Sequence, residues 1–336
     1  MDDRHSGGAL SPERVHTLLH GHRNAALIGA AATHRFFTHL AAGAATVEEL
    51  AARAGVAVRG AQALLDGLVA IGLVAVADGR YTNGEEAEAF LVEDRPGTLA
   101  PLARMTLGNL AQLAQLGEVV RTGEPVAAPL HEGEDHAFWH ELVPAIAPMA
   151  RAVAEVAARE LDVARAGTIA ILDVGGGSGA FAATLLRKNP EARATQLDGP
   201  VVNRIARDLT AREGVGDRFD TIDGDMRTAD FGEARYDIVV YSNIAHGEPA
   251  DSNRAIVAKM RRALRPGGTL VVSDFILEND RTGHPGVGTF HMMMLLSTRG
   301  GTVWRRADYE EWARAAGFTD VRFVPTRGPS TLVLAR

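Results

Sequence analysis

The segment Asp173-Val174-Gly175-Gly176-Gly177-Ser178-Gly179-Ala180 decides the fold of this 336-residue chain. It follows a strand-like run at 168–174 and leads into a helical run at 180–189. Glycines at such a junction let the backbone turn sharply and bring main-chain N–H groups and a helix N-terminus close to a ligand. The segment therefore predicts the first strand, turn and helix of a ligand-binding α/β domain.

The spacing of these glycines fits two kinds of nucleotide site. Gly175, Gly177 and Ala180 satisfy the G-x-G-x-x-[G/A] dinucleotide fingerprint. Gly175, Gly177 and Gly179 fit the G-x-G-x-G loop that admits the amino-acid end of S-adenosylmethionine. Asp198 closes the next strand-like run and suits either site, because its carboxylate can accept hydrogen bonds from both ribose hydroxyls. The turn alone leaves both alternatives open.

Strand-like and helical runs alternate from residue 168 onward, which is typical of a parallel sheet covered on both faces. The expected strands are 168–174, 194–198, 219–223, 236–241 and 269–274, and the expected helices between them are 180–189, 201–213 and 252–264. After a helix at 309–316, strands at 320–325 and 330–335 must pair antiparallel, because their connection is short. The predicted fold class is therefore α/β, a Rossmann-like doubly wound domain with a C-terminal antiparallel strand pair.

The N-terminal stretch predicts helices followed by a winged helix-turn-helix. Thr46 is an N-cap residue with a glutamate at the capping-box offset, and Gly55 ends that helix. A second helix is expected at 58–71, and two short strands joined through Asp78-Gly79 predict a hairpin. This pattern is typical both of DNA-binding modules and of dimerisation modules.

The helix at 58–71 favours the dimerisation module. A recognition helix presents several basic or amide side chains to base edges and phosphates. This one presents Arg59 and Gln62 together with the acidic Asp66, and it is otherwise small or apolar. We therefore predict no nucleic-acid partner.

The composition excludes several other classes of protein. The net charge of −7 argues against a surface that neutralises phosphates over the whole protein. The absence of cysteine excludes disulfides, thiolate-ligated metals and thiol nucleophiles. No apolar run approaches the roughly 18 residues needed to cross a bilayer, and the N-terminus shows no secretory signal. We expect a cytoplasmic protein without a membrane partner.

Three further features distinguish the two nucleotide sites. Gly224-Asp225-Met226 follows the third strand, where a carboxylate and an apolar side chain can hold an adenine. Arg265-Pro266-Gly267-Gly268 leads into the fifth strand, and a C-terminal antiparallel pair is not expected of a nicotinamide domain. Together these motifs resemble a class I S-adenosylmethionine-dependent methyltransferase.

The C-terminal motifs extend this resemblance to the small-molecule O-methyltransferases typified by the caffeic-acid enzymes. The motifs are Met294-Leu295-Leu296, Gly300-Gly301, Asp308-Tyr309, Trp312, Ala316-Gly317-Phe318 and 329–334. The resemblance implies a homodimer formed through the N-terminal domain, a small-molecule substrate and S-adenosylmethionine as cofactor. It implies cofactor contacts from the following residues: Gly175, Gly177, Asp198, Asp225 and Met226. We add Asp173 to these candidates, and Ser242, which stands where the family has a lysine.

The expected domain organisation follows from this resemblance. Residues 1–95 are expected to form the helical, winged-helix-like dimerisation domain, and residues 167–336 the catalytic domain. Residues 96–166 are expected to be linking helices that line the substrate pocket. Gly123, Pro125 and Pro129 break this stretch, and a new helix begins near Phe138-Trp139.

The chemical centre departs from the family pattern. His246 follows the fourth strand, where the family has His-Asp-Trp and its histidine deprotonates a substrate hydroxyl, but here the run is His246-Gly247-Glu248. Of the two acids that the family places around that histidine, one falls on Asp274 and the other on Val303. His291 stands where the family has an aspartate.

Two mechanisms are compatible with these substitutions. His246, oriented by Asp274, is a general base for O-methylation in one of them. In the other, His246, Glu248 and His291 bind zinc or iron, with Asp274 as a further ligand or a supporting carboxylate. Such a metal would chelate a 2-oxo acid and stabilise the enolate that attacks the methyl group, as the resemblance to 2-oxo-acid C-methyltransferases implies. We take metal-assisted C-methylation as the main hypothesis, because two coordinated substitutions then have one cause.

Two hypotheses from other classes remain open at this stage. The fold can bind S-adenosylmethionine without transferring its methyl group, as a regulator would. A nicotinamide oxidoreductase would bind NADH in place of S-adenosylhomocysteine.

Overall fold

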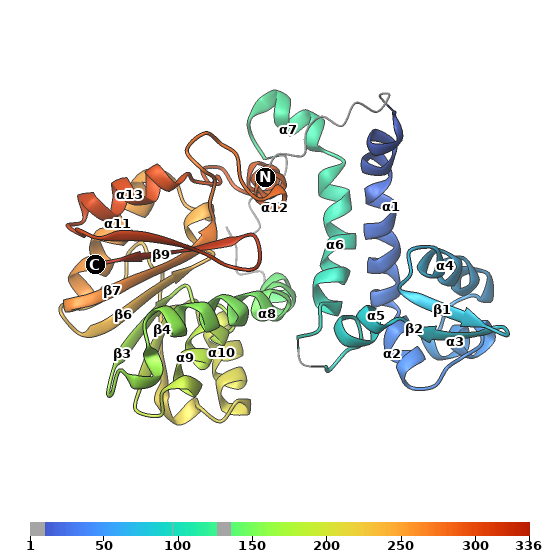
Figure 1. The fold of residues 1–336 in the computed structure, drawn as a ribbon, viewed down its shortest axis with the longest axis horizontal. Helices are drawn as coiled ribbons and strands as arrows, with labels where there is room; N and C mark the ends of the chain where they lie inside the picture. The colour runs from blue at the N-terminus through green and yellow to red at the C-terminus, as the bar shows by residue number, and fades with distance from the viewer. Residues whose placement is uncertain (1–10, 96, 126–135) are drawn as a thin grey trace. The chain divides into compact units, whose positions relative to one another are not determined.

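The computed structural model describes residues 11–95, 97–125 and 136–336 (Figure 1). The chain divides into two compact units, Met1–Ala114 and Gln115–Arg336. The stretch 96–166 is therefore shared between the units, and its expected break at Pro129 lies outside the described residues. Within the described ranges, no helix combines the length and the apolar character that crossing a bilayer requires.

The first unit consists of helices and one two-stranded hairpin. Its elements are α1 (Glu13–Thr33), α2 (Phe36–Ala41), α3 (Val47–Ala54), α4 (Val58–Ala70), β1 (Val74–Ala77), β2 (Arg80–Asn83), α5 (Glu85–Phe90) and α6 (Ala100–Leu113). Thr46 and Glu49 form the expected capping box of α3, and Gly55 ends this helix at φ 67°. Asp78 and Gly79 both adopt positive φ, as the tight turn between β1 and β2 requires.

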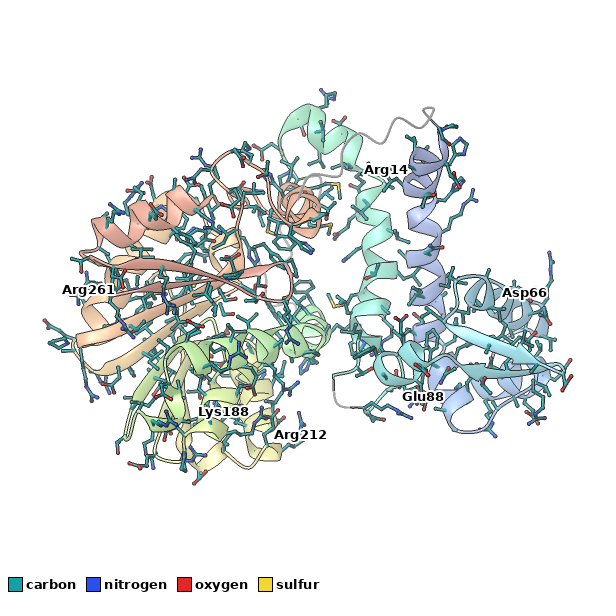
Figure 2. The ribbon with its side chains drawn as sticks, viewed as in Figure 1. Arg14, Asp66, Glu88, Lys188, Arg212 and Arg261 are labelled. Carbon is teal, nitrogen blue, oxygen red and sulfur yellow. The ribbon has the colours of Figure 1, made fainter. Side chains whose placement is uncertain are left out.

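The amide side chain of Gln62 on α4 is hydrogen-bonded within the protein. Gln62 Nε2 donates hydrogen bonds to Asp66 Oδ1 at 2.7 Å and to Tyr81 Oη at 3.1 Å. Figure 2 shows Asp66 at the outer surface of α4, where its negative charge would repel a phosphate. These contacts support the prediction that α4 is not a recognition helix.

The second unit contains a seven-stranded sheet and the helices that cover it. Its elements are α7 (Leu116–Thr122), α8 (His136–Glu160), η1 (Val163–Arg165), β3 (Ala170–Val174), α9 (Ala180–Lys188), β4 (Arg193–Asp198), α10 (Pro200–Arg212), η2 (Gly216–Arg218), β5 (Phe219–Asp223), β6 (Tyr236–Ser242), η3 (Ala245–Gly247), α11 (Ala250–Ala263), β7 (Leu264–Phe275), α12 (Pro285–Ser297), α13 (Arg306–Ala315), β8 (Val321–Pro325) and β9 (Ser330–Ala335).

The strand order is β5-β4-β3-β6-β7-β9-β8. The first five strands in this order are parallel, and β9 pairs antiparallel with both β7 and β8, as predicted. The chain winds outward from β3 in one direction through β4 and β5, and then returns to place β6 on the other side of β3. Ligands of such sheets bind at the carboxyl ends of the strands beside this switch point.

Each face of the sheet is covered by helices because both sets of alternating strand residues are apolar. Ile171, Val240 and Val271 pack on one face with α8, α9 and α10. Their neighbours Leu172 and Val239 pack on the other face with α11 and α13 (Figure 1). The rigid sheet thereby fixes the positions of the loops that leave its carboxyl ends.

Two elements, β7 and α13, begin well before the residues expected for them, at Leu264 and Arg306 in place of 269 and 309. β7 begins at Leu264, which pairs with Tyr236 before a shift in register, so that the proline- and glycine-containing segment lies within the strand. α13 begins at Arg306, because Asp308 accepts a hydrogen bond from the Arg305 main chain and caps the helix.

Candidate active site

The glycine turn lies directly after β3 and requires glycine at several positions. Gly175, Gly177 and Gly179 have φ values of 68°, 58° and 73°, which side chains disfavour. Gly176 is required for space, because a Cβ there would lie 2.5 Å from Gln196 Oε1 and 2.7 Å from the Asp173 carboxyl carbon. Gly179 immediately precedes α9, so the turn lies at a helix N-terminus, where the helix dipole favours a negatively charged ligand group.

Asp198, the last residue of β4, is joined to this turn. Its carboxylate accepts hydrogen bonds from Gly177 N at 3.0 Å and from Gly199 N at 2.7 Å. Burial raises the pKa of Asp198 to about 6, and these two hydrogen bonds oppose the shift. At neutral pH the ionised carboxylate retains lone pairs for ribose hydroxyls.

Asp173 lies beneath the turn, and its carboxyl group is fully buried without a hydrogen-bond partner for either oxygen among the described residues. Burial raises its pKa to about 7 and the negative charge of Asp198 adds to this shift, whereas the nearby main-chain N–H of Ala182 opposes it. A buried carboxyl without a partner suits a cationic ligand group, such as the ammonium of S-adenosylmethionine.

The remaining candidate cofactor residues lie at neighbouring strand ends. Asp225 and Met226 follow β5, and Lys259 Nζ holds this loop by donating to Met226 O at 2.7 Å. Ser242 is the last residue of β6. The next residue, Asn243, has φ 56° and turns the chain toward His246.

His246 and Asp274 are brought together by adjacent strands. His246 Nδ1 lies 2.6 Å from Asp274 Oδ1, and the His246 main-chain N–H donates to Oδ2 at 3.1 Å. Asp274 is fully buried and also accepts from Phe275 N at 2.8 Å. An ionised carboxylate only accepts hydrogen bonds, so this contact favours the tautomer with the proton on Nδ1, in which the Nε2 lone pair can accept a proton.

An aromatic pair that sequence analysis did not predict borders the His246 ring. Phe290 of α12 meets this ring edge to face at a centroid distance of 4.8 Å. Phe275 lies 6.2 Å from His246 and 4.3 Å from Phe290. Each residue adjoins a candidate in the sequence, but nothing in the pattern indicated that the two rings meet.

The segment 301–304 fixes the loop that carries His246. Thr302 N donates to His246 O at 2.8 Å, and Trp304 Nε1 donates to Ala245 O at 2.9 Å. Gly301 is needed for this approach, because a Cβ would lie 2.5 Å from His246 O. Val303, which stands where the family has a second acid, is buried among apolar side chains and cannot orient the imidazole.

The structure does not support the predicted metal site of His246, Glu248 and His291. Glu248 is buried and accepts from Arg227 Nε at 3.1 Å, from Arg227 Nη2 at 2.7 Å and from Ser252 Oγ at 2.5 Å. His291 Nε2 instead lies 2.8 Å from Thr302 Oγ1. Among the residues that the structure describes, no three His, Cys, Asp or Glu side chains gather as a metal site. The donor set of His246, Glu248 and His291 therefore does not fit zinc or iron.

Comparison with known proteins identifies the family. Residues 132–319 match the O-methyltransferase domain, and residues 16–93 match the O-methyltransferase dimerisation domain. The chain is 33% identical to a 3-hydroxy-5-methyl-1-naphthoate 3-O-methyltransferase of Streptomyces sahachiroi over 302 residues, covering 87% of this chain and 85% of the relative. It is 31% identical to the tetracenomycin polyketide synthesis 8-O-methyl transferase TcmO of Streptomyces glaucescens, covering 89% of each.

The fold is also that of a solved structure from this group. Human N-acetylserotonin methyltransferase in complex with S-adenosylmethionine superposes with a TM-score of 0.84 at 22% identity, covering 99% of each chain. The protein therefore belongs to the O-methyltransferase family that combines these two domains, and it is an S-adenosylmethionine-dependent methyltransferase.

Proposed function

We propose that the protein methylates a hydroxyl group on a small aromatic natural product, with His246 as the general base. The observation that carries this proposal is the pairing of His246 Nδ1 with buried Asp274, which leaves Nε2 as the proton acceptor. The relatives from Streptomyces named above are O-methyltransferases, which favours a hydroxyl over a carbon as the methylated group. This replaces the hypothesis of metal-assisted C-methylation.

His246 activates the substrate by removing its proton. A hydroxyl placed against Nε2 gives up its proton as its oxygen attacks, and Asp274 stabilises the imidazolium that forms. Bound S-adenosylmethionine supplies a methyl group on a sulfonium, whose carbon–sulfur electron pair stays on sulfur as the new oxygen–carbon bond forms. In-line placement of the two reactants supplies much of the remaining rate.

Phe275 and Phe290 support an aromatic substrate. Their rings pack against each other beside His246, and both are only partly buried. A flat ring stacked against this pair would place a ring hydroxyl near the imidazole. The naphthoate in the name of the first relative is a substrate of this shape.

A product assay tests the proposal. Hydroxynaphthoates and 2-oxo acids are incubated with S-adenosylmethionine, with and without a chelator, and methylated products are identified by mass spectrometry. We expect an O-methyl ether whose formation is insensitive to chelator and falls about 10²- to 10⁴-fold in His246→Gln. The control His34→Gln, which changes an exposed histidine of the first unit, keeps full activity. Carbon methylation of a 2-oxo acid, or full activity of His246→Gln, would overturn the proposal.

We also propose that the first unit forms a homodimer. The match to a dimerisation domain supports this, as do Val15, Leu18 and Leu19 of α1, which are 57%, 69% and 66% exposed. Such apolar side chains in one segment are typical of a surface that a partner covers. Sedimentation at micromolar concentration should give twice the monomer mass for the wild type and the monomer mass for Leu18→Glu. A monomeric wild-type protein would contradict this assignment.

A further inference from the structure

Arg227 lies between a candidate cofactor residue and the loop of the candidate base. Its Nη1 lies 3.3 Å from Asp225 Oδ2, and its main-chain N–H donates to Asp225 Oδ1 at 2.8 Å. On its other side it donates twice to Glu248, which follows His246 by two residues. One guanidinium therefore joins the loop after β5 to the loop after β6.

Glu248 fixes the position of this guanidinium. The Glu248 side chain is 5% exposed, whereas that of Arg227 is 56% exposed and that of Asp225 is 48% exposed. Two N–H groups of Arg227 donate to the two carboxylate oxygens of Glu248. This two-pronged contact fixes the orientation of the guanidinium as well as pairing its charge. Ser252 donates to the same carboxylate, so Glu248 is held before any ligand binds.

Both loops are also tied to α11. Asn253 Nδ2 donates to Ala245 O at 2.9 Å and to Glu248 O at 3.1 Å. Lys259 Nζ donates to Met226 O at 2.7 Å on the other loop. Because the main chain on both sides is anchored, Arg227 sets where the half-exposed Asp225 carboxylate points, without having to hold the loops themselves.

Asp225 retains acceptor capacity after these contacts. A carboxylate offers about four lone-pair positions, and Arg227 occupies one on each oxygen. The remaining positions suit an N–H donor such as the exocyclic amine of adenine. A hypoxanthine base carries a carbonyl oxygen in place of that amine, and the carboxylate would repel it.

We propose that Arg227 is a positioning residue that aims Asp225 at the exocyclic amine of the cofactor's adenine, and that Glu248 anchors it. The inference rests on Asp225 as the adenine contact, and it does not depend on which substrate atom is methylated. It assigns Glu248 a part in cofactor selection, in place of the metal ligation that its position in the sequence suggested.

The test compares two nucleotides that differ at one group. Binding of S-adenosylhomocysteine and of S-inosylhomocysteine is measured by calorimetry for the wild type and for Arg227→Met. We expect the wild type to prefer the adenine compound, and the ratio of the two dissociation constants to fall about tenfold in the variant. An unchanged ratio would overturn the proposal, including the case in which both nucleotides weaken equally.

Two further variants separate positioning from folding. Arg227→Met leaves the buried Glu248 unpaired, so Arg227→Gln/Glu248→Gln removes both charges together and keeps the fold testable. We expect this double variant to lose the same preference; its retention would contradict the proposal. Arg254→Met is the matched control, because Arg254 also pairs with two carboxylates, Asp251 and Glu311, and its loss should leave the ratio at the wild-type value. The ratio of the two dissociation constants does not depend on which substrate is methylated. If the protein failed to methylate hydroxyaromatic compounds, that result would therefore count against the proposed function alone.

Discussion

The two halves of the site, at one edge of one sheet, are built from different parts of the polypeptide. The proposed cofactor half, at the ends of β3 and β4, consists largely of main-chain groups: the positive-φ glycines, with Asp198 accepting a hydrogen bond from one of them. The base half, at the ends of β6 and β7, consists of side chains such as His246, Asp274 and Phe290. Substitutions in the cofactor half should therefore change cofactor affinity, and those in the base half should leave cofactor affinity unchanged and change the reaction of the methylated substrate.

Asp274→Asn should have the largest effect and should be confined to turnover. The amide cannot hold Nδ1–H as a carboxylate does, so His246 loses its tautomer preference, and kcat should fall about 10³- to 10⁴-fold. Methyl transfer to a hydroxyaromatic substrate measures this loss, and calorimetry should find the affinity for S-adenosylhomocysteine unchanged. Equal losses of affinity and turnover would erase the distinction between the two halves.

Gly176→Ala should mainly weaken the binding of S-adenosylhomocysteine, whereas Asp274→Asn should mainly lower turnover. The added Cβ would press on Gln196 and Asp173, and the turn must shift to relieve the overlap. Affinity for S-adenosylhomocysteine should fall about tenfold to a hundredfold. Gly60→Ala in α4 is the control, because no atom lies within 4 Å of the position that its added methyl group would take, and the helix tolerates alanine. Normal cofactor binding by Gly176→Ala would show that the turn is not the cofactor site.

The cofactor half should also respond to pH. The pKa of Asp198 is raised to about 6, so its acceptor function is lost as pH falls through that value. Asp173, with a pKa of about 7, loses its charge first, so affinity for S-adenosylhomocysteine should begin to weaken below about pH 7 and should fall by about tenfold or more per pH unit below about pH 6, which calorimetry between pH 5 and pH 8 would measure. A flat profile would contradict the role of Asp198.

Cofactor affinity should increase as pH rises, but the stability of the protein without cofactor should decrease. Asp173 and Asp198 have pKa values of about 7 and about 6 when folded, above the ordinary aspartate value. Between about pH 4 and pH 7 the folded state binds more protons at these groups, so their contribution to the free energy of unfolding decreases as pH rises. The increase in Tm on adding S-adenosylhomocysteine should therefore be larger at pH 8 than at pH 5.

Phe290→Leu should have the smallest effect. Loss of one ring of the aromatic pair should raise KM for an aromatic substrate about twofold to tenfold and leave cofactor affinity unchanged. Phe90→Leu changes a half-exposed phenylalanine in the first unit and serves as the control. An unchanged KM would remove the support that this pair gives to an aromatic substrate.

The geometry of the proposed cofactor half could be predicted from the sequence because the sequence signals for it are local. Consecutive glycines have few other uses after a strand, Asp198 closes one recognisable strand, and Asp225 lies two residues after another. The capping box at Thr46 and the C-terminal antiparallel pair were predicted for the same reason. One residue beneath the turn was missed: Gln196, which supports the turn by donating to Gly177 O, lies within a strand and carries no motif.

The base half was less accessible because its contacts join distant segments. The spacing of His246 and Glu248 suggested two metal ligands, but Arg227, which pairs with Glu248, belongs to another loop and gave no signal. The contact between the rings of Phe290 and His246 depends on how α12 packs, and the hydrophobic periodicity of the sequence does not determine this packing.

The protonation pattern of the His246 ring tests the central claim most directly. Nitrogen-detected NMR of protein labelled in histidine, with the signals assigned by their loss in His246→Gln, distinguishes a protonated ring nitrogen from a free one. At pH 8, with S-adenosylhomocysteine bound, the account predicts a proton on Nδ1, hydrogen-bonded to Asp274, and none on Nε2. A proton on Nε2 with Nδ1 free would contradict it, because the nitrogen beside the substrate would then have no lone pair to accept the hydroxyl proton.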